Sequence, residues 1–282
     1  MSRGFLLGAT AGRTTLTGEG LQHADGHSPL LAATNPAVVH YDPAFAYEVS
    51  HIMRSGLERM YGSTEEHPDG ENVIFYMTVY NEPVSQPKEP EDLDHEGLLR
   101  GMHRITAAEG DGPTVRLLAS GIAYPWIEKA ARLLAEDWGV SAELWSVTSW
   151  NELAREAVAT EEHNLLHPGD EARTPWVAAK LGDDSMPTVA VTDFMAAVPL
   201  QIARWVPGDY RVLGTDGFGF ADTRPAARRF FHVDAESVVV QTLQALADAG
   251  QVDRGQVEKA FAEYRIDDPT AVSDVKQEGG DA

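Results

Sequence analysis

The sequence predicts an α/β fold built on a largely parallel sheet. Two observations support this class. Predicted strands and helices alternate through the second half of the chain, which is typical of parallel sheets with helical crossovers. The predicted strands are also short, nearly continuous apolar runs, as expected for strands buried on both faces. Hydrophobic residues make up 43% of the 282 residues, which is enough for a substantial core.

The first 80 residues contain three apolar runs that predict strands, at residues 5–10, 38–41 and 73–80. The first is expected to be a buried strand, and a long polar loop from about residue 11 to residue 36 follows it. Asp42 is expected to cap a helix, with Pro43 at its first position. Apolar residues at helical spacing extend this helix to about Tyr61.

Residues 83–96 change in character, because prolines alternate there with acidic residues and one lysine. This composition is typical of a linker. We therefore predict a domain boundary, with one domain over residues 1–88 and a second over residues 89–265. Residues 266–282 are predicted to form a disordered acidic tail.

The second half of the chain alternates between apolar runs that predict strands and apolar residues at helical spacing. Strands are predicted at 115–120, 142–147, 188–191 and 210–213, and helices at 124–138, 151–158, 193–205, 223–231, 235–249 and 254–264. Gly139 and Gly250 are expected to end two of these helices, and Asp222 to cap one.

Composition excludes several classes of function. The chain has no cysteine, which excludes disulfides, thiolate metal sites and cysteine nucleophiles, and fits a cytoplasmic protein. The formal net charge of −22 disfavours binding to nucleic acid and to anionic membrane surfaces. No apolar run approaches the roughly 20 residues of a membrane span.

The densest polar cluster lies in the first loop, over residues 14–28. It contains the imidazoles of His23 and His27 and the carboxylates of Glu19 and Asp25. Histidine titrates near neutral pH and can donate or accept a proton, and α/β proteins place active sites on loops that follow strands. The alternative is a hydrogen-bonded loop whose histidines cap local turns.

Other chemistries are weaker alternatives. His23, Asp25 and His27 have ligand types suited to zinc or iron, but no third histidine stands nearby, so no metal ligand is assigned. The glycine-rich loop 214–219 lacks the glycine order and the lysine of phosphate-binding loops, so no cofactor-binding residue is assigned. No Gly-x-Ser-x-Gly elbow of a serine hydrolase is present.

Several long motifs resemble the homodimeric-type pyruvate dehydrogenase first component, which depends on thiamine diphosphate. They lie at residues 4–28, 41–49, 56–62, 147–155 and 210–219. The resemblance implies that residues 1–88 are the end of a pyrimidine-binding transketolase-like domain. It implies that residues 89–265 are a transketolase C-terminal-like α/β domain.

The resemblance also implies a reaction, in which pyruvate is decarboxylated and its acetyl unit passes to a lipoyl group. His23 matches the family histidine that faces the substrate, and Glu19 and His27 share its loop in orienting roles. The implied cofactors are thiamine diphosphate and Mg²⁺. The implied partners are a second copy in a homodimer and the lipoyl-bearing acetyltransferase component.

The family's diphosphate and magnesium motif and its cofactor-activating glutamate are not found in this sequence. We therefore expect this chain to need the missing N-terminal portion of the enzyme as a partner. The alternative is a non-catalytic remnant, or a dimerisation or interaction module of the same family.

Overall fold

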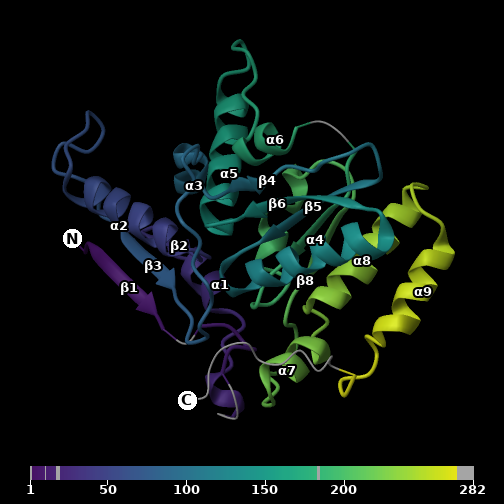
Figure 1. Ribbon diagram of the computed structural model, residues 1–282. Coiled ribbons are helices and arrows are strands. Elements are labelled where there is room, and N and C mark those ends of the chain that lie inside the picture. Colours follow the sequence, from purple (N-terminus) through teal and green to yellow (C-terminus); the bar gives the residue numbers. More distant parts are fainter. Residues whose placement is uncertain (1, 10, 17–19, 183–184, 272–282) are drawn as a thin grey trace.

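The computed structural model describes residues 2–9, 11–16, 20–182 and 185–271, and its frame consists of two sheets (Figure 1). The first is a parallel sheet in the order β1-β3-β2. Its strands are β1 (Gly4–Gly8), β2 (Val38–Tyr41) and β3 (Ile74–Thr78).

The second sheet has the order β4-β6-β5-β7-β8. Its strands are β4 (His103–Thr106), β5 (Thr114–Ala119), β6 (Ser141–Ser146), β7 (Thr188–Val191) and β8 (Tyr210–Leu213). Only β4, on the edge, runs antiparallel to its neighbour. The α/β class with a largely parallel sheet is therefore confirmed.

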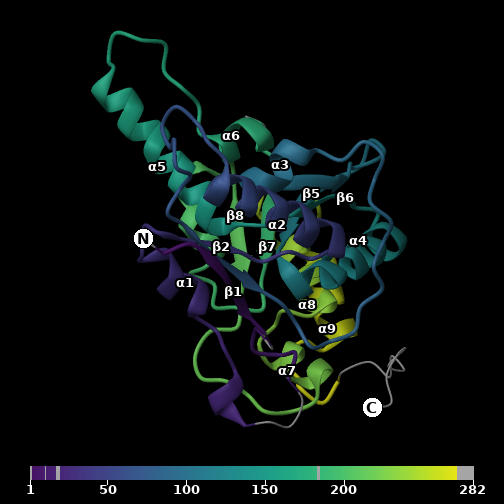
Figure 2. The same cartoon turned by 90° about the vertical axis from the view of Figure 1, so that its left-hand side faces the viewer.

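Helices cover both faces of the second sheet (Figures 1 and 2). The α-helices are α1 (Ser28–Ala33), α2 (Ala46–Tyr61), α3 (His95–Arg100), α4 (Tyr124–Trp138), α5 (Trp150–Leu166), α6 (Trp176–Leu181), α7 (Arg224–Phe230), α8 (Ala235–Asp248) and α9 (Arg254–Tyr264). Three 3₁₀ helices are η1 (Leu21–His23), η2 (Gly121–Ala123) and η3 (Pro199–Trp205).

Alternation along the central strands assigns each face to a set of helices. Leu117 of β5 and Val189 of β7 pack in the cluster that contains the buried residues of α4 and α8. Their neighbours Leu118 and Ala190 pack in the cluster formed with α5, α6 and η3. Phe75 of the first sheet belongs to the same cluster as Leu117, so the two sheets share one core.

Several predicted elements need correction. The loop of residues 11–36 is not free of secondary structure, because it contains η1 and α1. The predicted linker ends in α3, while residues 79–94 before it contain no helix or strand. Strand β4 and helix α6 were not predicted, and the helix expected over 193–205 is the 3₁₀ helix η3, from Pro199.

The two predicted N-terminal helix caps, Asp42 and Asp222, are also wrong. Helix α2 begins at Ala46, and the buried Glu48 side chain accepts the backbone amides of Ala44 and Phe45 at 2.7 and 3.1 Å. Asp222 accepts the amide of Thr223, one residue before α7, and caps no helical amide. Asp42 is buried for a different reason, given below.

The division at residue 88 and the disordered tail stay predictions. Ala271 of the tail accepts a hydrogen bond from the Arg229 guanidinium, and residues 272–282 lie outside the described residues. No helix in the described part of the chain is long and apolar enough to cross a membrane.

The predicted burial of the first strand is wrong as well. β1 is the edge strand of its sheet, and the side chains of Leu6 and Leu7 are both exposed. Because successive side chains of a strand point to opposite faces, β1 has an exposed leucine on each face, while Phe5 packs against the core.

Asp42 joins the two sheets at the point where β2 ends. Its backbone amide donates to the Thr148 carbonyl at 2.7 Å, and its carbonyl accepts the Gly121 amide at 3.0 Å. Its buried carboxylate accepts hydroxyl hydrogen bonds from Thr78 (2.6 Å), Tyr80 (2.5 Å) and Ser120 (2.7 Å). Burial raises the pKa of the Asp42 carboxyl.

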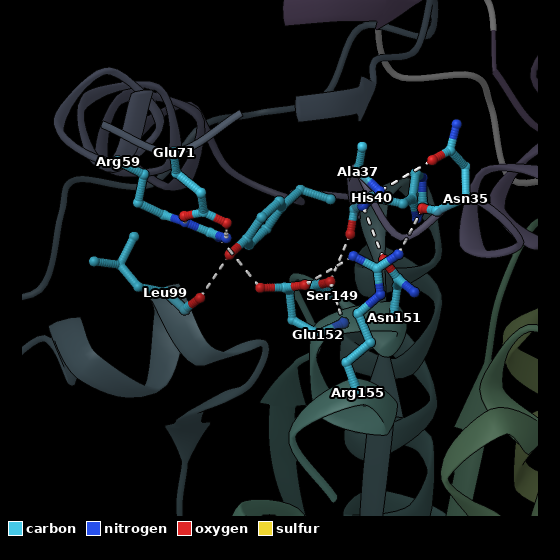
Figure 3. Close-up of polar contacts among 11 residues, drawn as sticks. Asn35, Ala37, His40, Arg59, Glu71, Leu99, Ser149, Asn151, Glu152 and Arg155 are labelled. Atoms are coloured by element: carbon cyan, nitrogen blue, oxygen red, sulfur yellow. Dashed lines mark hydrogen bonds and ion pairs between the residues drawn. The ribbon is translucent and has the colours of Figure 1, made fainter. Parts of the chain in front are cut away.

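Further polar contacts between the two sheets lie along β2, on the side toward α5 (Figure 3). The Ser149 hydroxyl donates to the His40 carbonyl at 2.5 Å and also caps α5 by accepting the Glu152 amide. The Asn151 side chain accepts the His40 amide at 3.2 Å. Arg59 of α2 pairs with Glu71 at 2.6 Å and with Glu152 of α5 at 3.3 Å. The N-terminal cap of α5 is therefore part of the contact between the two sheets.

We expect Asp42→Ala to destabilise the whole chain, because the hydroxyl groups of Tyr80 and Ser120 lose their acceptor and that of Thr78 keeps only the Tyr41 carbonyl. An unsatisfied buried group costs about 1–3 kcal/mol, so the free energy of unfolding should fall by roughly 3 kcal/mol or more. Urea unfolding of the variant measures this. The exposed Asp92→Ala is the control and should lie within about 0.5 kcal/mol of the wild type. A loss below about 1 kcal/mol for Asp42→Ala would contradict the assignment.

Candidate functional site

The carboxyl ends of the parallel strands in both sheets meet in one region, and the loop after β1 crosses it. Arg13, Thr14 and Thr15 of this loop are buried. The Arg13 amide donates to the carbonyl of Asp193, which follows β7, at 3.2 Å. The Arg13 guanidinium donates to the Thr215 carbonyl, beyond β8, at 2.6 Å. This part of the loop is therefore attached to the second sheet.

Asp193 is the central acceptor of this attachment. Its Oδ2 accepts the Thr14 amide at 3.1 Å, and its Oδ1 accepts the Thr14 hydroxyl at 2.7 Å. The side chain is fully buried, and burial raises the pKa of the Asp193 carboxyl to about 7, against the attraction of the Arg228 guanidinium. A side chain at Gly12 would collide with this carboxylate, since a Cβ there would lie 2.1 Å from Oδ2.

Helix α7 places two guanidinium groups beside the same loop. Arg224 donates to the Thr15 carbonyl at 2.8 Å, and Arg228 donates to the Thr14 hydroxyl at 3.3 Å. Both pair with Glu82, which follows β3. The Arg228 guanidinium also lies 4.6 Å from the centre of the Trp126 ring. Segments after β1, β3, β7 and β8 thus meet through charged and polar side chains.

The remainder of the loop lies at the surface. His23 ends η1 and is exposed, and His27 precedes α1 and is also exposed. The segment rests on the glycine-rich loop after β8, because a Cβ at Gly219 would lie 2.6 Å from the Ala24 side chain. This close approach shows why residue 219 has no side chain.

Asp25 has a local structural role. Its Oδ1 accepts the amides of His27 and Ser28 at 3.1 and 3.0 Å, and its Oδ2 accepts the Ser28 hydroxyl. Ser28 is in turn 2.8 Å from the Tyr76 hydroxyl of β3. Asp25 therefore fixes the start of α1 and its position on the first sheet.

Two of the three predicted site residues lie within the described part of the chain. His23 and His27 lie on one exposed segment, where a bound substrate could reach their rings, and Glu19 lies outside the described residues. Within the described ranges, no group of three or more His, Cys, Asp or Glu side chains is placed to hold a metal ion. Both carboxylate oxygens of Asp25 accept hydrogen bonds at the start of α1. The arrangement therefore does not support a metal centre on His23, Asp25 and His27.

Asp193, Glu82 and Arg228 were not predicted from the sequence as parts of this region. A signal existed for the first two, because each directly follows a predicted strand, and the carboxyl ends of parallel strands share one edge. Asp193 was instead assigned to a helix. Arg228 had no such signal, since its place depends on how α7 packs.

The environment of Asp193 predicts a pH dependence of stability. The pKa of the Asp193 carboxyl is raised in the folded state. Its contribution to the free energy of unfolding is therefore present below the unfolded pKa of about 4 and is lost as pH rises through about 7. Asp193→Asn keeps an acceptor for the Thr14 amide but cannot ionise. Urea unfolding should therefore show the wild type losing roughly 2–4 kcal/mol relative to the variant between pH 4 and pH 8. Parallel pH profiles would contradict a buried, titrating Asp193.

Two family models match the chain. Residues 1–87 match the pyruvate dehydrogenase E1 component middle domain, and residues 101–234 match the transketolase-like C-terminal domain. The pyruvate dehydrogenase E1 component of Mycolicibacterium smegmatis is 61% identical over 96% of this chain. The chain spans 29% of that relative's length.

Solved structures agree on the fold. Transketolase of Pichia stipitis, in its H261F mutant, superposes with a TM-score of 0.61 at 14% identity, covering 86% of this chain and 30% of that one. A split-gene transketolase, solved as an inactive β4 tetramer, has a TM-score of 0.52 at 16% identity, covering 86% of this chain and 65% of that one. The chain therefore resembles the C-terminal part of pyruvate dehydrogenase E1 components, with a match to the E1 middle domain followed by a match to the transketolase-like C-terminal domain.

Proposed function

We propose that this chain is one part of a pyruvate dehydrogenase E1 component and acts in decarboxylation of pyruvate with acetyl transfer to a lipoyl group. The observation that carries the proposal is the 61% identity to an E1 component over nearly the whole chain. The loop of residues 11–28 supports it, because buried groups anchor one half of the loop and leave His23 exposed on the other half. This arrangement suits a residue that must meet a substrate.

His23 is the residue we assign to the substrate. Its imidazole would donate a proton or a hydrogen bond to the reacting oxygen of pyruvate or to the sulfur of the lipoyl group that leaves as a thiolate. The exposed His27 would orient the substrate from the same loop, and we assign Glu19 the same role from its place in the sequence. The anchored segment of Arg13, Thr14 and Thr15 would hold the loop in place, which limits the conformational freedom of His23.

The described residues do not fit the cofactor on their own. Thiamine diphosphate needs donors for a diphosphate and ligands for Mg²⁺. The amide of Gly121, in front of α4, donates to the Asp42 carbonyl, and the Asp42 carboxylate lies beside it. An anion is therefore repelled where the turn after β5 would otherwise receive it. We assign the cofactor and its metal to the part of such an enzyme that this chain does not match.

The part of the enzyme that this chain does not match is the main partner that the proposal requires. A chain that spans 29% of its relative's length is expected to be inactive alone. The structural resemblance to a split-gene transketolase is consistent with an enzyme divided between chains. A homodimer, the lipoyl-bearing acetyltransferase component and a cytoplasmic location remain predictions from the resemblance.

The test is pyruvate decarboxylation with thiamine diphosphate and Mg²⁺. This chain is assayed alone and then mixed with an M. smegmatis E1 component from which the matched segment has been removed. We expect activity only in the mixture. Folded chains that remain inactive together would contradict the proposal and favour a non-catalytic interaction module.

His23→Ala in the active mixture should lower kcat about 100-fold or more, because a positioned general acid or base contributes at least that factor. Its melting temperature should stay within about 1 °C of the wild type, since the side chain is exposed. His67→Ala, at another exposed histidine, is the control and should retain full kcat. Equal kcat in both variants would remove His23 from the site.

A further inference from the structure

Two histidine rings meet where helix α2 packs against helix α3, away from the loop that bears His23. His51 lies on α2, and His95 is the first residue of α3. The ring centroids are 4.6 Å apart, and the ring planes stand at 88° to each other. His51 Nδ1 and His95 Nε2 are 3.1 Å apart. The proposed reaction gives this pair no role.

The carboxylate of Glu89 determines which nitrogen of His51 carries a lone pair toward its neighbour. Glu89 Oε1 lies 3.1 Å from His51 Nε2. An ionised carboxylate only accepts hydrogen bonds, so His51 Nε2 carries the hydrogen in this contact. In the neutral ring, Nδ1 then has the lone pair, and His95 Nε2 donates to it. Histidines that bind metal ions are held in the same way, with one nitrogen on the ion and the other on a carboxylate.

The spacing of the two nitrogens fits two ligands of one ion. Zinc lies about 2.0–2.1 Å from an imidazole nitrogen that binds it, so nitrogens 3.1 Å apart subtend an angle of roughly 100° at the ion. This angle lies between those of neighbouring ligands in octahedral and in tetrahedral coordination. For both lone pairs to face the ion, the His95 ring must turn and carry its hydrogen on Nδ1. His95 is exposed, and exposed side chains change rotamer readily.

The two helices that carry these rings are fixed relative to each other. They pack side by side (Figures 1 and 2). Glu48 of α2 pairs with His103 of β4 at 2.7 Å, and both side chains are buried. The Asp94 carboxylate caps α3 by accepting the Gly97 amide at 2.9 Å, and it also pairs with Lys180. The backbone of the site is therefore formed in advance, which lowers the entropy cost of binding.

The charge around the pair favours a cation. Residues 86–96 contain five acidic residues and one lysine, and the whole chain has a formal net charge of −22. The lysine, Lys88, pairs with Glu91 of the same segment at 3.6 Å. A surface of this kind raises the local concentration of cations.

We propose that His51 and His95 bind one divalent transition-metal ion, with Glu89 holding His51 in the ligating tautomer and water completing the coordination. Imidazole nitrogen suits zinc, copper and nickel, whereas Mg²⁺ takes oxygen ligands. The site therefore differs in chemistry from a magnesium site for thiamine diphosphate and does not depend on the proposed function. Within the described ranges no third candidate ligand joins the pair, so the ion keeps positions open to water.

An ion on both rings would cross-link two parts of the chain. His51 lies in the segment that matches the E1 middle domain, and His95 lies between that match and the next one. The ion would therefore bridge α2 to the start of the second domain, across the proline-rich segment. Because it binds only the folded arrangement, it would also stabilise that arrangement.

Titration calorimetry of the whole chain with zinc chloride measures the site. We expect one ion in the tightest site, and His51→Ala and His95→Ala should each weaken its binding at least about tenfold, because one of two ligands is lost. His163→Ala is the matched control and should bind as the wild type. His163 and His167 stack at 4.2 Å and 23°, so their in-plane lone pairs do not converge on one ion. An absence of binding by the wild type, equal binding by both site variants, or its loss in His163→Ala would overturn the site.

The role of Glu89 has its own test. Glu89→Ala should weaken zinc binding about tenfold, since loss of such a carboxylate typically costs about 10–100-fold in affinity. Glu89→Gln should restore most of the affinity, because its amide oxygen still accepts from His51 Nε2. The exposed Glu91→Ala controls for the loss of one negative charge. Equal affinities of Glu89→Ala and Glu91→Ala would remove Glu89 from the site.

Copper gives a spectroscopic readout of the same ligands. With one equivalent of Cu²⁺, electron paramagnetic resonance should show coupling to two imidazole nitrogens in the wild type and to one in His95→Ala. The same number of coupled nitrogens in both proteins would exclude His95 as a ligand and overturn the proposal.

Discussion

The arrangement of this chain depends on the burial of one carboxylate, that of Asp42. Removing an ionisable group from water is costly, and the cost is met only where several donors converge on it. Here the donors come from β3, from Tyr80 two residues beyond it and from the turn after β5. They can converge only when the two sheets stand at one relative position. Asp42 therefore fixes the placement of one sheet against the other in a way that apolar packing alone would not.

This placement explains where the candidate site lies. In α/β sheets, ligands commonly bind outside the carboxyl ends of strands, at the point where the strand order reverses. In the second sheet that point lies between β5 and β7, since the chain leaves β5 toward β6 and then returns to β7 on the other side. Asp42 and Tyr80 are held beside the end of β5, and Thr14 is held on Asp193 beyond β7. These groups lie in the crevice beside a cavity lined by Tyr80, Glu82 and Gly121, and the exposed His23 lies farther along the loop that follows Thr14.

Much of the fold could be predicted from the sequence because the second sheet follows strong periodic rules. The strands at 115–120, 142–147 and 188–191 are short, mostly apolar runs, and the helix over 124–138 has both a wide apolar face and a closing glycine. The elements that were missed are short. Helices α1, α3 and α6 have six residues each, too few for a periodic signal, and β4 has a polar sequence.

The site was less accessible to prediction than the fold. Residue types identified the loop with His23, but not that Arg13, Thr14 and Thr15 are its buried anchor. The sequence around Asp42 is typical of a helix cap. Its hydrogen-bond partners are instead 36 to 106 residues away along the chain. Contacts at such separations leave no trace in a local pattern.

The attachment of this loop also determines how late in translation the loop can fold. Thr14 is bound by Arg228, which is 214 residues later in the sequence, and Thr15 by Arg224, 209 residues later. On a ribosome that adds about 5–20 residues per second, the segment that bears His23 would wait on the order of ten seconds or more for its last anchors. Throughout that interval the edge of β1 is already synthesised and unpaired. The loop that bears His23 reaches its folded position only near the end of synthesis.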